Sequence, residues 1–250
     1  MSAVRPVLIV CAFPHPSLRR RRLRTGLALA AALLIALTAG CSSTSSSHSA
    51  SGRPITMDGN GSASSSSAFR GDELDHPIPL DAAASSAEFT SSTGAKATLG
   101  ALGHGQLMLV YFGYTHCPDV CPTTMADLGQ ALRQLPAPVA ARTQVVFITS
   151  DPARDTPPVM KAWLSNFDPG LPHRFVGLTG TVTQIDTLAK SVGVPLFPPV
   201  TEPNGTITVQ HGAQTLAFVD DQARVLWTAD TPVGDYAHDI SALAQRLPPA

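Results

Sequence analysis

The sequence predicts an α/β fold in three layers, with a central sheet between helices. Two runs, the continuous apolar segment 107–112 and the largely apolar segment TQVVFIT at 143–149, have the length and the β-branched and aromatic content of strands buried on both faces. A helix is expected between these runs because apolar residues recur there at spacings of three and four, namely Met125, Leu128, Ala131, Leu132 and Leu135. Strands that alternate with helices are typical of this fold class.

The elements around these two strands can be assigned in order. Short strands around a turn are expected within 78–98. After the second apolar run, Thr156 is expected to be the N-cap of a helix that has Pro157 at its first position and ends near Phe167. Thr181 begins a further helix, in which Gln184 completes a capping box.

The C-terminal part predicts a hairpin followed by a helix. A proline-rich loop at 195–204 leads into a short strand at 206–209. Two further strands, 216–219 and 224–227, flank a polar turn, and an amphipathic helix is expected over 234–247. The sheet is therefore expected to end in a terminal β-hairpin that a final helix covers.

Length and charge limit the number of domains and the class of partner. The chain has 250 residues, 44% of them hydrophobic and 14% charged, which suits one well-formed core. A net charge of −1 gives no argument for nucleic-acid binding. We expect one folded domain at 69–250 and a monomer.

The N-terminal segment predicts export and a lipid anchor. An arginine cluster precedes an apolar run at 27–40 that is too short for a membrane span and fits a signal peptide over 1–40. The residues LTAGC at 37–41 resemble a bacterial lipobox, with Thr38 where the motif prefers leucine. Cleavage before Cys41 would leave a lipid on its sulfur and hold the domain on the extracytoplasmic side of the membrane. Plain secretion is the alternative.

A serine-rich segment at 41–68 follows the lipobox. Large apolar residues are scarce in it, so it cannot bury enough surface to offset the entropy of ordering. We interpret it as a flexible tether between the membrane and the folded domain.

Two cysteines follow the first apolar strand. Cys117 and Cys121 are each followed by a proline, and the residue before a proline is disfavoured in the helical region. We therefore expect Cys121 to be extended, with Pro122 at the first position of the next helix. A helix N-terminus lowers the pKa of a nearby thiol, and the resulting thiolate is both a nucleophile and a soft metal ligand.

The segments YFGYTHCPDVCP (111–122) and TSDPARDTP (149–157) resemble the signature of the Sco/SenC family of copper-binding proteins. The segment FVGLTG (175–180) and the histidine at 211 also stand where that family has them, and the resemblance covers about 85–247. It implies a thioredoxin-like fold and a copper site, for Cu(I) or Cu(II), formed by Cys117, Cys121 and His211. It also implies work in assembling the CuA centre of cytochrome c oxidase, with the oxidase copper subunit as partner.

One position departs from the family pattern. The family usually has aspartate before the histidine, whereas this chain has Gln210 before His211. The change removes a possible hydrogen-bond acceptor for the imidazole.

Other readings of the site residues stay open. The two cysteines could form a static structural disulfide, and His116, next to Cys117, competes with His211 as third ligand. Asp119 and Asp151 could approach the metal. The spacing of the thioethers indicates core positions instead, at Met108, Met125 and Met160.

Two functions follow from the cysteine pair. A copper metallochaperone would bind the ion through the CxxxC dithiol and a histidine, without turnover. A thiol–disulfide oxidoreductase would instead reduce the cysteines of the oxidase copper subunit, so whether the chain is an enzyme is left undecided. Three residues separate Cys117 from Cys121, whereas thioredoxin-like catalysts have two, and this favours the metallochaperone.

Overall fold

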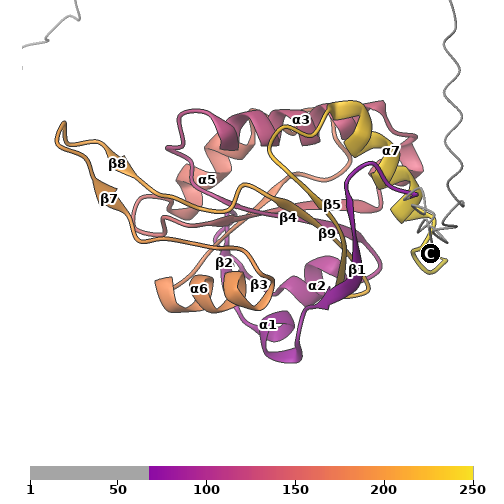
Figure 1. Cartoon of the computed structure of the whole chain (residues 1–250), viewed down its shortest axis with the longest axis horizontal. Helices are drawn as coiled ribbons and strands as arrows, with labels where there is room; N and C mark the ends of the chain where they lie inside the picture. Colours follow the sequence, from indigo (N-terminus) through magenta and orange to yellow (C-terminus); the bar gives the residue numbers. More distant parts are fainter. Residues whose placement is uncertain (1–67, 250) are drawn as a thin grey trace, which may run out of the picture. The chain divides into compact units, whose positions relative to one another are not determined.

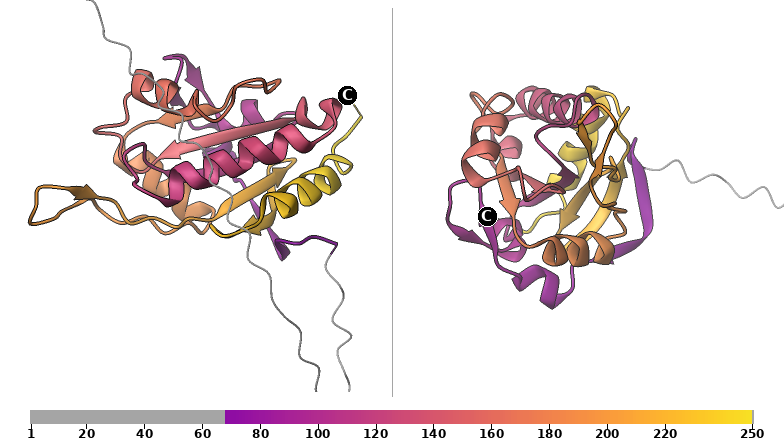
Figure 2. Two further views of the ribbon diagram at one scale, coloured as in Figure 1. Left: turned by 90° about the horizontal axis from the view of Figure 1, so that it is seen from above. Right: turned by 90° about the vertical axis from the view of Figure 1, so that its left-hand side faces the viewer.

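A computed structural model describes residues 68–249. In this range an eight-stranded mixed sheet, in the order β1-β10-β9-β4-β5-β6-β2-β3, lies between two groups of helices, and β7 and β8 form a separate hairpin (Figures 1 and 2). The strands are β1 (Asp72–Pro79), β2 (Phe89–Ser91), β3 (Lys96–Ala97), β4 (Leu107–Gly113), β5 (Thr143–Thr149), β6 (Val176–Thr179), β7 (Val200–Thr201), β8 (Ile207–Thr208), β9 (Thr215–Val219) and β10 (Gln222–Trp227). The helices are α1 (Ala82–Ser86), α2 (Leu99–Gly103), α3 (Val120–Gln134), α4 (Ala137–Ala140), α5 (Pro157–Leu164), α6 (Val182–Ser191) and α7 (Val233–Ala244).

The two apolar runs form adjacent, parallel central strands. Leu107 pairs with Thr143 at one end of β4 and β5, and Gly113 pairs with Thr149 at the other. All seven residues of each strand are buried, as expected for strands with helices on both faces. Because the pair is parallel and in register, the loops that follow β4 and β5 leave the sheet at the same edge.

Each face of the sheet has its own hydrophobic core. Leu109, Tyr111 and Phe147 pack with residues of α3, α5 and α7 on one face. Val110, Phe112 and residues of α6 pack on the opposite face, which also carries α1 and α2 (Figure 1). Successive side chains of β4 therefore enter different cores, as the two-residue period of a strand requires.

The predicted α/β architecture is confirmed, including the terminal hairpin and helix. β9 and β10 are joined by Asp220 and Asp221, whose φ angles of 49° and 56° suit a tight hairpin turn. The capping box of Thr181 and Gln184 is present at the start of α6.

Several boundaries differ from the prediction. α5 ends at Leu164 and not near Phe167, because the last residues form tight turns in which Phe167 N–H donates to the Leu164 carbonyl. β7 forms inside the expected proline-rich loop by pairing with β8, and Figures 1 and 2 show this hairpin extending from the rest of the described chain. α1 and α2 have five residues each, too few for a periodic pattern to reveal them.

Across residues 68–249, the helices are all too short or too polar to span a bilayer. The expected signal peptide (1–40), Cys41 and all but the last residue of the tether (41–68) lie outside the described residues, so they stay predictions. Phe69, where the folded domain is expected to begin, is buried.

Candidate metal centre

The cysteine loop connects β4 to α3 at the edge where the central strands end. Gly113 is the last residue of β4, and a Cβ at this position would lie 2.9 Å from Cys121 Sγ and 2.7 Å from Tyr111 Cε1. Contacts this short require atoms to shift, so glycine leaves the space that the Cys121 sulfur occupies.

The prediction that Cys121 is extended is wrong. α3 begins at Val120, with Asp119 as N-cap, so Cys121 lies in its first turn and Pro122 is not the first helical residue. Proline is tolerated in a first turn because backbone N–H groups there have no partner within the helix. The Cys121 N–H instead donates to Cys117 Sγ at 3.5 Å, and the sulfur therefore satisfies one of these free donors.

His211 reaches the cysteines from a distant part of the sequence, between β8 and β9. Its backbone pairs with Leu196 in an isolated bridge, and Gly212 N–H donates to the Pro195 carbonyl at 2.8 Å. The imidazole Nε2 lies 3.3 Å from Cys121 Sγ. Its ring also packs edge-on against two tyrosine rings, those of Tyr111 and Tyr114, with centroids 6.0 and 5.8 Å away.

A backbone carbonyl accepts the imidazole hydrogen bond for which an aspartate at position 210 would be a possible acceptor. His211 Nδ1 lies 3.0 Å from the Gly212 carbonyl oxygen, which can only accept a hydrogen bond. Nδ1 therefore carries the proton, and Nε2 presents its lone pair to Cys121. Gln210 does not disturb this arrangement.

The ligand atoms of Cys117, Cys121 and His211 all lie within 4.8 Å of one another. Between residues 68 and 249, no other group of three or more cysteine, histidine or acidic side chains meets this geometry. Cys121 is fully buried, whereas Cys117 is half-buried, and both are free thiols. The three residues could hold one metal ion.

The two thiols have opposite electrostatic properties. A hydrogen bond from Cys121, together with bonds from two backbone N–H groups, lowers the pKa of Cys117 to about 4 despite the cost of burial. The same bond to Cys117 raises the pKa of Cys121, and burial raises it further. At neutral pH the pair therefore holds one proton, and the more accessible sulfur is the thiolate.

The cysteine loop is fastened by Asp155, a residue that sequence reasoning missed. The fully buried carboxylate accepts hydrogen bonds from Thr115 N–H (3.0 Å), the Thr115 hydroxyl (2.6 Å) and the Thr149 hydroxyl (2.7 Å). It thereby joins the loop after β4 to the end of β5. The TSDPARDTP segment was the available signal, but the family resemblance and the helix start that it indicates do not assign a role to Asp155.

The competing ligand candidates lie apart from the three donor atoms. His116 Nδ1 faces Thr115 Oγ1 at 3.1 Å and Asp155 Oδ1 at 3.7 Å, and its side chain is 51% exposed. Asp151 is buried and forms an ion pair with Arg154. Asp119 lies beside the centre but outside the group of three. The spacing argument for the methionines is confirmed, because Met108, Met125 and Met160 are fully buried in the core.

A cleft of about 310 Å³ gives access to the centre from one side. Cys117, Tyr114 and His211 line it, together with neighbouring residues of both loops. An approaching molecule would meet Cys117 and the imidazole before the buried Cys121.

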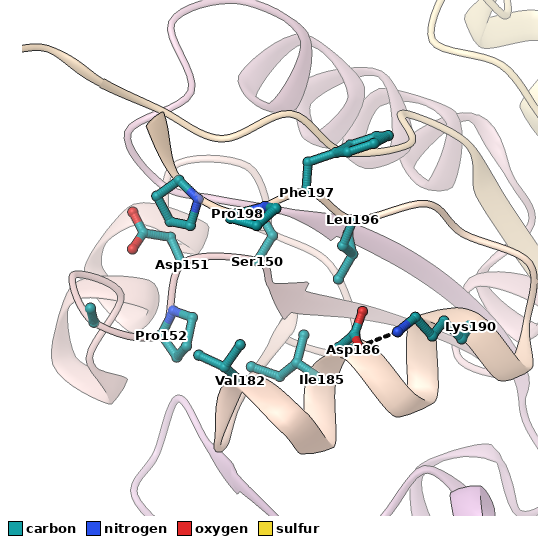
Figure 3. Close-up of a pocket in the computed structure, with 12 residues that line it drawn as sticks. Ser150, Asp151, Pro152, Val182, Ile185, Asp186, Lys190, Leu196, Phe197 and Pro198 are labelled. Carbon is teal, nitrogen blue, oxygen red and sulfur yellow. Dashed lines mark hydrogen bonds and ion pairs between the residues drawn. The ribbon is translucent and has the colours of Figure 1, made fainter. Parts of the chain in front are cut away.

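A larger cavity, of about 440 Å³, lies beside the segment that pairs with His211 (Figure 3). Leu196, Phe197 and Ile185 give it an apolar lining, and Asp186 forms an ion pair with Lys190 at 2.6 Å on its α6 side. The Phe197 N–H donates to the Gln210 carbonyl at 3.0 Å, so one wall of the cavity is bonded to the residue before His211. Its lining contains neither cysteine nor histidine, and it is not a thiolate or imidazole metal site.

Comparison with known proteins identifies the family. The family model described as SCO1/SenC matches residues 80–245. The chain belongs to this family. A protein of Stutzerimonas stutzeri that is named for copper binding is 44% identical over 115 residues, which are 46% of this chain and 53% of that relative's length.

Solved Sco structures have the same fold. The apo Sco1 protein of Thermus thermophilus is 30% identical with a TM-score of 0.60, and the match covers 70% of this chain and 96% of that one. ScoI of Bradyrhizobium japonicum with copper bound is also 30% identical, with a TM-score of 0.52, 67% of this chain covered and 97% of that one. The prediction of a thioredoxin-like fold is confirmed.

The unequal thiols predict an unusual pH dependence of alkylation. With a pKa of about 4, Cys117 should react with iodoacetamide at nearly the same rate at pH 6 and pH 8 in the reduced, metal-free chain. The rate of an ordinary thiol, with a pKa near 8.5, falls about tenfold per pH unit in this range. Mass spectrometry of quenched samples gives the rate and the modified residue.

Cys117→Ser is the control for this measurement, because the fully buried Cys121 should then react slowly at either pH. A tenfold loss of rate per pH unit in the unsubstituted chain would contradict the low pKa of Cys117.

Proposed function

We propose that this chain binds one copper ion through Cys117 Sγ, Cys121 Sγ and His211 Nε2, and delivers it to the CuA centre of cytochrome c oxidase. The observation that carries the proposal is the convergence of two sulfurs and an imidazole nitrogen within 4.8 Å. Membership of the SCO1/SenC family supports it, as do the copper-named relative and the copper-bound ScoI structure.

The donor set suits copper as a cargo. Thiolate sulfur selects Cu(I), and imidazole suits both Cu(I) and Cu(II). A structural zinc site would usually have four protein ligands, whereas this group has three. Three ligands leave a coordination position that an acceptor protein can enter, and the cleft beside Cys117 provides the approach.

The geometry assigns a task to each residue that forms the centre. Gly212 orients the imidazole by accepting from Nδ1, so Nε2 is free to bind. Cys117 provides a preformed thiolate, whereas Cys121 must release its proton when the ion binds. Delivery would reverse these steps, with Cys121 taking up a proton again.

The choice of third ligand can be tested with a matched pair of variants. His211→Ala should raise the copper dissociation constant more than the roughly 10- to 100-fold expected for losing a group outside the ligand set. His116→Ala removes the histidine side chain next to Cys117. It should change the copper dissociation constant little, because the His116 ring faces Thr115 and Asp155. Competition titration with a chromophoric chelator measures both constants.

Cys117→Ser combined with Cys121→Ser should abolish copper uptake and the thiolate-to-Cu(II) absorption band. Unchanged copper content in the double variant would refute the site. A larger effect of His116→Ala would instead mean that the third ligand is misplaced.

A second function is favoured by the inequality of the thiols. In a reductase, the Cys117 thiolate would attack a substrate disulfide and release one substrate sulfur as a thiolate. Cys121 would then attack Cys117 in the mixed disulfide and release the second sulfur. The substrate would gain two electrons as the 117–121 disulfide forms, and an external dithiol would be needed to regenerate the pair.

Rescue of a deletion strain distinguishes the two functions. If the chain delivers copper, its loss should lower cytochrome c oxidase activity under copper limitation, and added copper should restore it at least in part, because mass action can replace a chaperone. Rescue by a membrane-permeant thiol, and not by copper, would favour the reductase. Normal oxidase activity at limiting copper would contradict both.

The lipid anchor is a further part of the proposal, and it is supported by the leader, the lipobox-like residues and the serine-rich segment. Cys41→Ser should prevent lipidation and either leave the precursor uncleaved or release the chain to the soluble extracytoplasmic fraction. Cys11→Ser, within the expected leader, is the matched control and should leave processing unchanged. Normal cleavage and membrane retention of the Cys41→Ser chain would contradict the anchor.

A further inference from the structure

Tyr111 has an unsatisfied hydroxyl beside the metal centre. It is a central residue of β4, and its side chain is fully buried. The hydroxyl oxygen is one of three buried side-chain atoms between residues 68 and 249 that have no hydrogen-bond partner. A buried hydroxyl without a partner is destabilising, so this O–H is available to a stronger acceptor that forms beside it.

The group that this hydroxyl can reach is the Cys121 sulfur. A Cβ at Gly113 would lie 2.7 Å from Tyr111 Cε1 and 2.9 Å from Cys121 Sγ. The tyrosine ring and the sulfur are therefore close to each other on either side of this glycine. The Thr124 hydroxyl donates to the Val120 carbonyl at 2.9 Å, and its oxygen forms no hydrogen bond with the Tyr111 hydroxyl.

The same tyrosine also contacts the third donor residue. Its ring meets the His211 ring edge-on at a centroid distance of 6.0 Å, and His211 Nε2 lies 3.3 Å from Cys121 Sγ. Tyr111 therefore borders two of the three donor residues, and it is not among the residues that line the cleft.

We propose that Tyr111 is a positioning residue whose hydroxyl donates a hydrogen bond to Cys121 Sγ when that sulfur holds the copper ion. The inference rests on the proposed function. A protonated thiol is a weak acceptor, whereas a metal-bound thiolate carries negative charge and accepts more strongly. The hydroxyl would thus gain its partner only in the loaded state.

Such a bond would favour Cu(I) over Cu(II). Reduction of the ion leaves more electron density on its ligands, and a donor aimed at sulfur stabilises that density. The bond also lowers the energy of the sulfur lone pair, so the thiolate-to-Cu(II) absorption needs more energy. Tyr111 would in this way set the preferred oxidation state of the cargo without binding it.

Tyr111→Phe tests the proposal because it removes the hydroxyl and keeps the ring that packs on His211. We expect the Cu(I) dissociation constant to rise roughly tenfold. The Cu(II) constant should rise less, and the thiolate absorption band should move to longer wavelength. The measurements are chelator competition for each oxidation state and absorption spectroscopy on the full chain in mild detergent.

Tyr236→Phe is the matched control. Tyr236 is as buried as Tyr111, but its hydroxyl donates to the Thr228 carbonyl at 3.4 Å in the α7 region. This variant should leave the band and the ratio of the two constants unchanged and should lower the stability of the metal-free chain. Tyr111→Phe should leave that stability unchanged or raise it, since its hydroxyl has no partner in the metal-free form.

The outcomes separate this inference from the function on which it rests. A Tyr111→Phe chain that binds copper with an unchanged band and an unchanged ratio would overturn the role of Tyr111 alone. Loss of stability in the metal-free Tyr111→Phe chain would also overturn it, by showing that the hydroxyl already has a partner. Failure of the unsubstituted chain to bind copper would overturn the proposed function, and this inference with it.

Discussion

The position of the candidate metal centre depends on the hydrogen bonds to the buried carboxylate of Asp155. A carboxylate removed from water is stable only when its oxygens are hydrogen-bonded, and Asp155 meets this need with three donors from Thr115 and Thr149. Because Thr115 is two residues before Cys117, these bonds transmit the rigidity of the sheet to the first sulfur. The Ser150 N–H adds to the connection by donating to the Gly113 carbonyl at 2.7 Å. The parallel pairing of β4 and β5 is therefore what allows one side chain to hold both loops.

The inequality of the two sulfurs follows from their places in this frame. Cys117 is in the loop, where backbone N–H groups and the cleft favour a thiolate, and Cys121 is in the first turn of α3, closed in by Gly113 and Tyr111. Copper delivery and disulfide reduction would both use this difference, and metal and disulfide compete for the same sulfurs. The outer sulfur is the one that a partner meets first in either reaction.

The sequence predicts those parts of the structure that depend on local pattern. The apolar runs at 107–112 and 143–149 and the capping box at Thr181 are local features, and each is present. The geometry of Cys121 was mispredicted because the restriction before proline is a preference, and here the Cys117 sulfur offsets it with a hydrogen bond. Asp155 and Tyr111 were missed for a different reason. Their roles appear only when segments 40 residues apart meet, or when one hydroxyl within an apolar strand is found to have no partner.

The long separation between Cys121 and His211 has a consequence for how the centre could respond to misfolding. These ligands are 90 residues apart in sequence, and in an unfolded chain bringing them together would cost substantial loop-closure entropy. The two cysteines are four residues apart, so they remain close together even in an unfolded chain. The imidazole reaches them only after β9 has paired with β4 and the segment 195–197 has bonded to 210–212. Three-ligand binding would therefore report that both halves of the domain have assembled. The ion would act as a reversible cross-link that stabilises the native topology over partly folded forms.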